Sequence, residues 1–210
     1  MARLNNYEKT KRLVGLAILT AIVAILQALS PIVPLPVSMT FALTPIILGA
    51  AIYGKWAGAY LGSVFGLIAY IMGVLGRDGF TAFLIYFTNK DSIFSIDSLM
   101  VLFVCLFKGA AAGFVSGVIF KLFSKKNELT ASFAAGAACS IVNTGIFVIF
   151  AISFFVPHLE AFSAAYFSGT AVVPLVFFTL AGINFIAEFL INMVLAVVIA
   201  RIIKVVKIQS

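Results

Sequence analysis

The chain has 210 residues, of which 63% are hydrophobic and 10% are charged, and its mean hydropathy is +1.20. A soluble domain cannot bury that much apolar surface, because about half of the residues in an ordinary globular domain are apolar. The net charge of +7 is not gathered in a basic domain, so we expect no nucleic-acid partner. Backbone polar groups in lipid must be satisfied internally, and the long apolar runs lack strict alternation. The composition therefore predicts an all-α integral membrane bundle.

Six apolar stretches follow one another along the chain, and each predicts a transmembrane helix. They cover residues 13–30, 41–53, 56–76, 98–120, 131–156 and 171–200. We treat residues 1–210 as a single transmembrane domain that binds a substrate.

The basic residues predict the orientation of these six spans. Of the 14 Lys and Arg residues, most lie before the first stretch, between the second and third, around the end of the fourth, and after the last. They are Arg3, Lys9, Lys11, Arg12, Lys55, Lys121, Lys125, Lys126, Arg201, Lys204 and Lys207. With six spans these four places share one side of the membrane, and the positive-inside rule makes that side cytoplasmic. Both termini are therefore predicted to be cytoplasmic.

Prolines and glycines mark the first four stretches. Three prolines within residues 31–36 interrupt any helix there, so we expect an outer loop of fixed shape. The second stretch is short and contains Pro45. Glycines recur every four residues from just before the third stretch into it, at Gly54, Gly58, Gly62 and Gly66, and within the fourth, at Gly109, Gly113 and Gly117. This spacing places them on one helix face, where a neighbouring backbone can approach closely.

Two outer connections carry polar and aromatic residues. The connection 77–97 contains Asn89 and several aromatic side chains, and it is either a lid over the bundle or a solvated connector with a short interfacial helix. The connection 157–170 contains the only histidine, His158, which we expect to be exposed and without a functional role.

Polar side chains at membrane depth predict an interior site. Lys108 lies about 15 Å into the fourth stretch, and Glu188 lies near the centre of the sixth. Charged groups are costly in lipid, so each should face the bundle interior, a partner or a cavity. They either pair with each other or leave Lys108 to meet an anionic group of a substrate.

The remaining candidate residues are asparagines. Asn184 and Asn192 flank Glu188 at four-residue spacing and form one stripe with it, while Asn143 lies in the middle of the fifth stretch. Together with Lys108 and with Asn89 from the outer connection, they form our candidate substrate-binding set. The same amides can instead hydrogen-bond neighbouring helices and only join them together.

Enzyme and metal motifs are missing. Residues 49–55 match the start of a phosphate-binding loop, but Trp56 stands where Ser or Thr should coordinate magnesium. The sequence has no His/Glu metal cluster and no catalytic serine arrangement. Cys105 and Cys139 both lie inside spans and are expected to be packing residues. We therefore expect no enzyme activity, no metal and no cofactor in this chain.

Several segments, taken together, resemble the substrate-binding S components of energy-coupling factor (ECF) transporters, which take up vitamins in prokaryotes. The segment Ala17-Ile-Leu-Thr-Ala21 is similar to the Ala-x-x-x-Ala motif by which S components dock on the transmembrane coupling subunit. Residues 44–62 look like the second and third helices of that family. Phe107-Lys-Gly-Ala-Ala-Ala-Gly113 and Ser140-Ile-Val-Asn-Thr-Gly145 look most like its pantothenate-type branch.

The resemblance implies a transport function in the prokaryotic cytoplasmic membrane. Such a subunit captures a vitamin, here pantothenate, at its outer face and delivers it inward. It docks through Ala17 and Ala21 on the coupling subunit (the T component), and two separate cytoplasmic ATPases hold ATP and magnesium. Lys108, Asn143 and Asn184 would complement the carboxylate, hydroxyls and amide of pantothenate. The alternatives are another vitamin or precursor (riboflavin, folate or thiamine) or an autonomous proton-coupled carrier with Glu188 as its titrating group.

Overall fold

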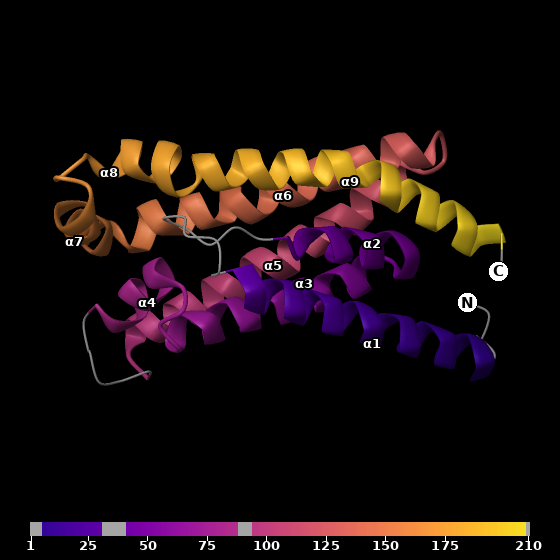
Figure 1. Ribbon diagram of the computed structural model, residues 1–210, viewed down its shortest axis with the longest axis horizontal. Coiled ribbons are helices and arrows are strands. Elements are labelled where there is room, and N and C mark those ends of the chain that lie inside the picture. The colour runs from indigo at the N-terminus through magenta and orange to yellow at the C-terminus, as the bar shows by residue number, and fades with distance from the viewer. Residues whose placement is uncertain (1–5, 31–40, 88–93, 209–210) are drawn as a thin grey trace.

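The computed structural model describes residues 6–30, 41–87 and 94–208, with the side chains of Ile183, Lys207 and Ile208 left out (Figure 1). Within these ranges the chain is helical, with no strand, which confirms the predicted all-α class. The elements in chain order are α1 (Asn6–Leu29), α2 (Leu43–Tyr53), α3 (Lys55–Val74), α4 (Gly79–Tyr86), α5 (Ile96–Phe123), α6 (Glu128–Phe154), α7 (Val156–Tyr166), α8 (Val172–Pro174), the π-helix η2 (Leu175–Leu180) and α9 (Gly182–Ile208).

The described helices include five that are long and apolar enough to cross a membrane. These are α1, α3, α5, α6 and the continuous run Val172–Val206, which includes most of α9. The second predicted span is shorter: α2 has 11 residues, about 16 Å, or roughly half of a hydrocarbon core about 30 Å thick. It starts near the middle of the bundle and runs toward the end where α1 begins (Figure 1). The predicted proline-rich loop at 31–36 lies outside the described residues.

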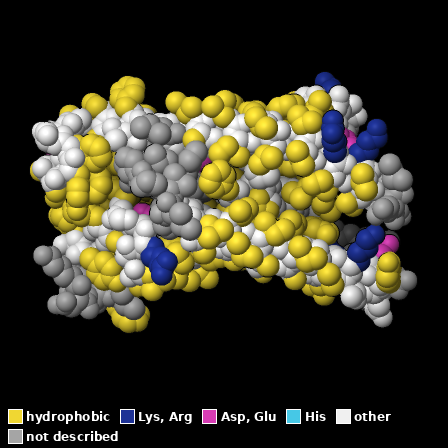
Figure 2. All heavy atoms as spheres, viewed as in Figure 1, with side chains coloured by type: hydrophobic (Ala, Val, Ile, Leu, Met, Phe, Trp, Pro, Cys, Tyr) yellow, Lys and Arg dark blue, Asp and Glu magenta, His cyan; other side chains and the backbone are white. Residues whose placement is uncertain are grey.

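The two ends of the bundle differ in charge. The start of α1 and the end of α9 lie at one end, and α4 and α7 lie at the other (Figure 1). Figure 2 shows Lys and Arg side chains gathered at the first end, with hydrophobic side chains covering the flank between the ends. This is the charge pattern of a membrane protein with its basic end in the cytoplasm. Six spans and cytoplasmic termini stay predictions.

The glycine stripes bring α3 and α5 into backbone contact. A Cβ atom added to Gly62 would collide with the Gly109 carbonyl oxygen, and one added to Gly58 would collide with that of Gly113. The same collisions occur in the opposite direction, from α5 toward α3. The predicted close approach of these two helices is therefore confirmed.

Two apolar clusters fill the bundle. The first joins residues of α1, α2, α3, α5, α6 and α9, including Ile46, Leu61 and Phe65. The second joins α4, α5, α6, α7 and η2, including Phe80 and Leu159. Both cysteines are buried and free, as packing residues should be.

Both outer connections contain a helix, which was one of the two alternatives for the first connection and was not predicted for the second. The connection 77–97 contains α4, and α5 already begins at Ile96. The connection 157–170 consists largely of α7, because Pro157 stands in its first turn and Leu159 and Phe162 pack inward. The prediction that His158 is exposed was wrong: its exposure is 7%, and its Nε2 lies 3.3 Å from Asp97 Oδ2.

Candidate functional site

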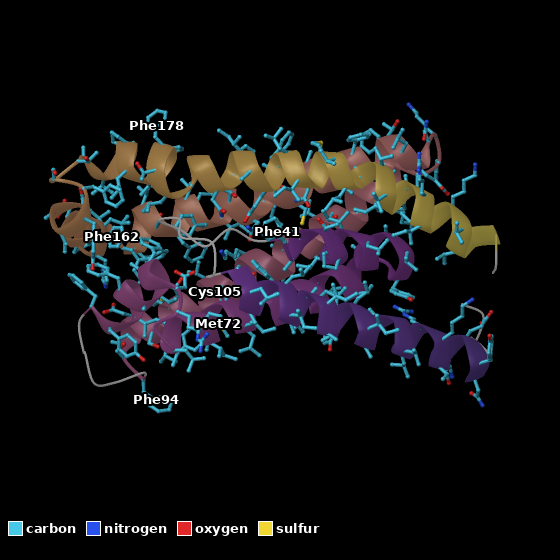
Figure 3. All side chains as sticks on the ribbon, in the orientation of Figure 1. Phe41, Met72, Phe94, Cys105, Phe162 and Phe178 are labelled. Carbon is cyan, nitrogen blue, oxygen red and sulfur yellow. The ribbon has the colours of Figure 1, made fainter. Side chains whose placement is uncertain are left out.

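A cavity of about 70 Å³ lies among α1, α3, α4, α5, α6, α7 and α9. Its walls are mostly apolar and include Phe65, Phe80 and Phe147. Cys105 also lines it, and Figure 3 shows this residue within the bundle. The polar side chains of the lining are Gln27, Asp78, Thr81, Lys108, Asn143, Thr144, Asn184 and Glu188. This composition, largely apolar with a few placed polar groups, is typical of sites for small organic ligands, but the cavity is smaller than the about 300–1,000 Å³ of such sites, so a ligand of that size requires it to widen.

The polar centre of this cavity is the Glu188 carboxylate on α9, which is 1% exposed. Asn143 on α6 donates to its Oε2 over 3.4 Å, and Asn184 donates to its Oε1 over 3.0 Å. A buried carboxylate is costly unless it is hydrogen-bonded, so two amide donors from two helices are the partners such a group needs.

These two hydrogen bonds also fix which way both amides point. A carboxylate only accepts hydrogen bonds, so each asparagine turns its NH₂ group toward Glu188 and its carbonyl oxygen elsewhere. The Oδ1 atoms of Asn143 and Asn184 are buried and have no hydrogen-bond partner within the described part of the chain. Gln27 Oε1, on α1, is in the same condition. The cavity lining thus offers three unsatisfied acceptors, and such groups in native structures call for a partner.

Lys108 places a positive charge in the same lining. Its Nζ lies 5.8 Å from the centroid of the Phe65 ring and 5.6 Å from that of Phe147, both within the range of cation–π attraction. No hydrogen bond or ion pair joins its ammonium to any residue that the structure describes. The direct Lys108–Glu188 ion pair, one of the two alternatives, is therefore not formed. An anionic group entering the cavity would find the three N–H donors of this ammonium available.

The structure splits the predicted asparagine stripe into two parts. Asn192 lies one turn beyond Glu188 and is not part of the cavity lining. Its Nδ2 donates to Ser140 Oγ over 2.9 Å, and its Oδ1 accepts from Thr44 Oγ1 over 3.0 Å. Asn192 therefore joins α9 to α6 and to the start of α2. Asn89 lies outside the described residues.

The candidate set left out four polar lining residues, namely Gln27, Asp78, Thr81 and Thr144. Gln27 is buried, and its Nε2 contacts Ser30 Oγ over 3.3 Å. It is the only carboxamide in the stretch 13–30, and this could have marked it. Asp78 caps α4, since its Oδ1 accepts from the backbone N–H of Thr81 over 3.1 Å. An aspartate directly before a short aromatic run is a helix-start signal.

Aromatic side chains of α4 and α7 lie together at the end of the bundle opposite the basic end. The Phe162 ring, labelled in Figure 3, lies 5.1 Å from those of both Phe80 and Phe83. Phe80 and Leu159 also line the cavity itself. The connection 77–97 therefore contributes a wall of the cavity, not only a link between spans.

The predicted docking residues lie on the opposite side of α1 from the core. Ala17 and Ala21 are exposed, whereas Leu19, Val23 and Gln27 are the buried residues of this helix. The small side chains of Ala17 and Ala21 project little from the exposed face of α1, beside the exposed Ile18 and Ile22.

Comparison with known proteins gives one match. A family model described as "ECF transporter, substrate-specific component" matches residues 11–204, which is nearly the whole chain. Searches of curated proteins and of solved structures found no match. The matched range contains all of the polar residues that line the cavity.

Proposed function

Because this chain belongs to the family of substrate-specific components of ECF transporters, we propose that it captures a vitamin in the cavity between α5, α6 and α9. Members of this family are membrane transport subunits and not enzymes. The observation that carries the proposal is the lining itself, which combines one ammonium and three unsatisfied amide oxygens in an apolar enclosure.

Lys108 favours a ligand with one anionic group, whereas the carboxylates of Asp78 and Glu188 and the amide oxygens favour several hydrogen-bond donors elsewhere on that ligand. Lys108 would hold the anionic group, and the amide oxygens of Gln27, Asn143 and Asn184 would accept from hydroxyl or amide N–H groups. Glu188 would position the two asparagines or accept from a ligand hydroxyl. Pantothenate has one carboxylate, two hydroxyls and an amide, and it is our first choice of substrate. Riboflavin, folate, thiamine or a precursor are the alternatives.

Transport requires partners that this chain does not contain. We propose that Ala17 and Ala21 form the contact with the transmembrane coupling subunit, because they are small and exposed on α1. Two cytoplasmic ATPases would bind ATP and magnesium, and the complex would lie in a prokaryotic cytoplasmic membrane with both termini of this chain inside. The aromatic contacts between α4 and α7 would part to admit the vitamin from the outer side.

The test is binding of a panel of labelled vitamins to the purified chain in detergent, without any partner. We expect saturable binding of pantothenate. The double variant Asn143→Ala/Asn184→Ala should bind it at least tenfold more weakly, since each lost hydrogen bond contributes about 1 kcal/mol. The variant Asn127→Ala, which changes the same side chain at the cap of α6, should bind like the parent.

Three outcomes would change the proposal. Binding of another vitamin, with the same loss in the double variant, would keep the site and correct the ligand. If the double variant bound the vitamin with the affinity of the parent, the binding site would have to lie elsewhere in the protein. If folded, monodisperse protein bound no vitamin, the autonomous proton-coupled carrier would be favoured, and uptake into proteoliposomes driven by a pH gradient and abolished by Glu188→Gln would establish it.

A further inference from the structure

A second hollow, with a volume of about 780 Å³, opens at the basic end of the bundle. It lies between the start of α1, the turn from α2 to α3 and the end of α5. Four cationic side chains line it, namely Arg12, Lys55, Lys121 and Lys125. None of the described residues in its lining is acidic. The positive-inside rule explains why basic residues gather at this end, but it does not require four of them to share one cleft.

Backbone geometry brings these charges together from three helices. Gly54 has φ +92°, a conformation that glycine adopts readily, and it lets α3 start directly after α2. A Cβ added to Gly117 would lie 2.6 Å from the Lys55 Cα, so this glycine allows Lys55 to pack against α5. Arg12 Nη2 donates to the Tyr53 carbonyl oxygen over 3.1 Å, which holds α1 against the same turn.

The cleft also has an aromatic side. The rings of Trp56 and Phe114 meet edge to face at 5.2 Å. Lys55 Nζ lies 5.8 Å and 5.0 Å from their centroids. Trp56 is 72% exposed and stands at a helix end next to the basic residues, the position in which tryptophan meets the headgroup layer of a membrane. The site therefore combines a cationic rim with an apolar surface at headgroup level.

We propose that this cleft binds the headgroup of an anionic phospholipid, with its phosphate among Lys55, Lys121 and Lys125. Basic pockets between transmembrane helices bind such headgroups, and a bound anion would relieve the mutual repulsion of four like charges. Inorganic phosphate shares the phosphate chemistry but has no acyl chain to lie along Trp56. The site is separate from the vitamin cavity, with which it shares no lining residue.

The single tryptophan of the chain reports directly on this cleft. The protein is placed in nanodiscs of a neutral lipid, to which phosphatidylglycerol or phosphatidylcholine with brominated acyl chains is added in increasing fraction. Bromine quenches tryptophan fluorescence on contact. We expect half-maximal quenching at a several-fold lower fraction of the anionic lipid than of the neutral one. Equal quenching by the two lipids would overturn the proposal.

Matched variants distinguish binding of the lipid in this cleft from a general attraction of anionic lipids to the basic end of the bundle. Lys121→Gln/Lys125→Gln should raise the half-quenching fraction of the anionic lipid by about fivefold for each lysine removed. Lys126→Gln/Lys204→Gln removes two charges from the same end but outside the cleft lining, and it should stay within about twofold of the parent. Equal losses in both variants would reduce the effect to surface charge, and reversal by excess inorganic phosphate would assign the cleft to free phosphate. Either result would refute the lipid site.

Discussion

Adding one methyl group to Gly62 should destabilise the whole bundle. The new Cβ of Gly62→Ala would collide with the Gly109 carbonyl oxygen and lie 3.0 Å from the backbone N of Ala110, so it meets main chain that cannot rotate aside. Ordinary contacts of a Cβ begin at 3.4 Å, and α3 must therefore move away from α5 at this level. Overpacking of this kind costs about 1–3 kcal/mol. For a protein of this length, that lowers the midpoint of thermal unfolding by roughly 2–12 °C.

The chain provides a matched control for this change. Gly145, in the middle of α6, would place a Cβ in open space, with no atom within 4 Å. Gly145→Ala therefore adds the same methyl group and gains helix propensity of up to about 1 kcal/mol without a collision. Both variants are compared with the parent by thermal unfolding in one detergent, followed by circular dichroism or by loss of monodispersity. If Gly62→Ala were as stable as Gly145→Ala, the close backbone contact of α3 with α5 would be refuted.

Three further predictions concern the proposed vitamin site and the proposed docking face. Lys108→Met should weaken binding of an anionic vitamin by about tenfold or more, since a charged hydrogen bond contributes about 1.5–3 kcal/mol, and should weaken binding of a neutral analogue far less. If equilibrium binding showed equal losses of affinity for both ligands, the charge of Lys108 would have no part in recognising the ligand. Ala17→Trp should abolish uptake in cells that express the whole transporter and leave vitamin binding by the isolated subunit intact, so normal uptake would contradict the docking role. Asn192→Ala should lower the unfolding midpoint through its partners Ser140 and Thr44 but keep the vitamin affinity within about twofold, and a large loss of affinity would place Asn192 in the site.

Much of the fold and part of the site were predictable, because lipid allows few alternatives. Long apolar runs without water must be helices, and the cost of charge in lipid drives Lys108 and Glu188 inward. The four-residue glycine spacing likewise predicted a contact that depends only on helix geometry. Each of these inferences depends only on the sequence of one segment and on its lipid surroundings. None of them requires knowing which residues of other helices lie opposite that segment.

The other features depend on partners that are distant in the sequence. His158 is buried because Asp97, at the start of α5, and the ring of Phe87 lie against it. Asn184 and Asn192 occupy equivalent positions on one helix stripe, yet only Asn184 reaches the cavity. The short α2 brings Thr44 to the level of Asn192 and fills that part of the bundle. No local pattern distinguishes the two asparagines.

The two halves of the bundle are held together by different interactions, and this locates the part that must move. From the basic end up to the level of the cavity, α3 and α5 meet backbone to backbone, and Asn192 joins three helices through short hydrogen bonds. At the other end, α4 and α7 meet through the rings of Phe80, Phe83 and Phe162. Each of these helices also has a polar contact to the rest of the bundle, from Tyr86 to the Val74 carbonyl oxygen and from His158 to Asp97, so moving one of them breaks one such contact. Opening the basic half would leave buried polar groups unpaired, at about 1–3 kcal/mol each. If the proposed function holds, we therefore expect the substrate to enter between α4 and α7, while the basic half moves as one body with the face of α1 that carries Ala17 and Ala21.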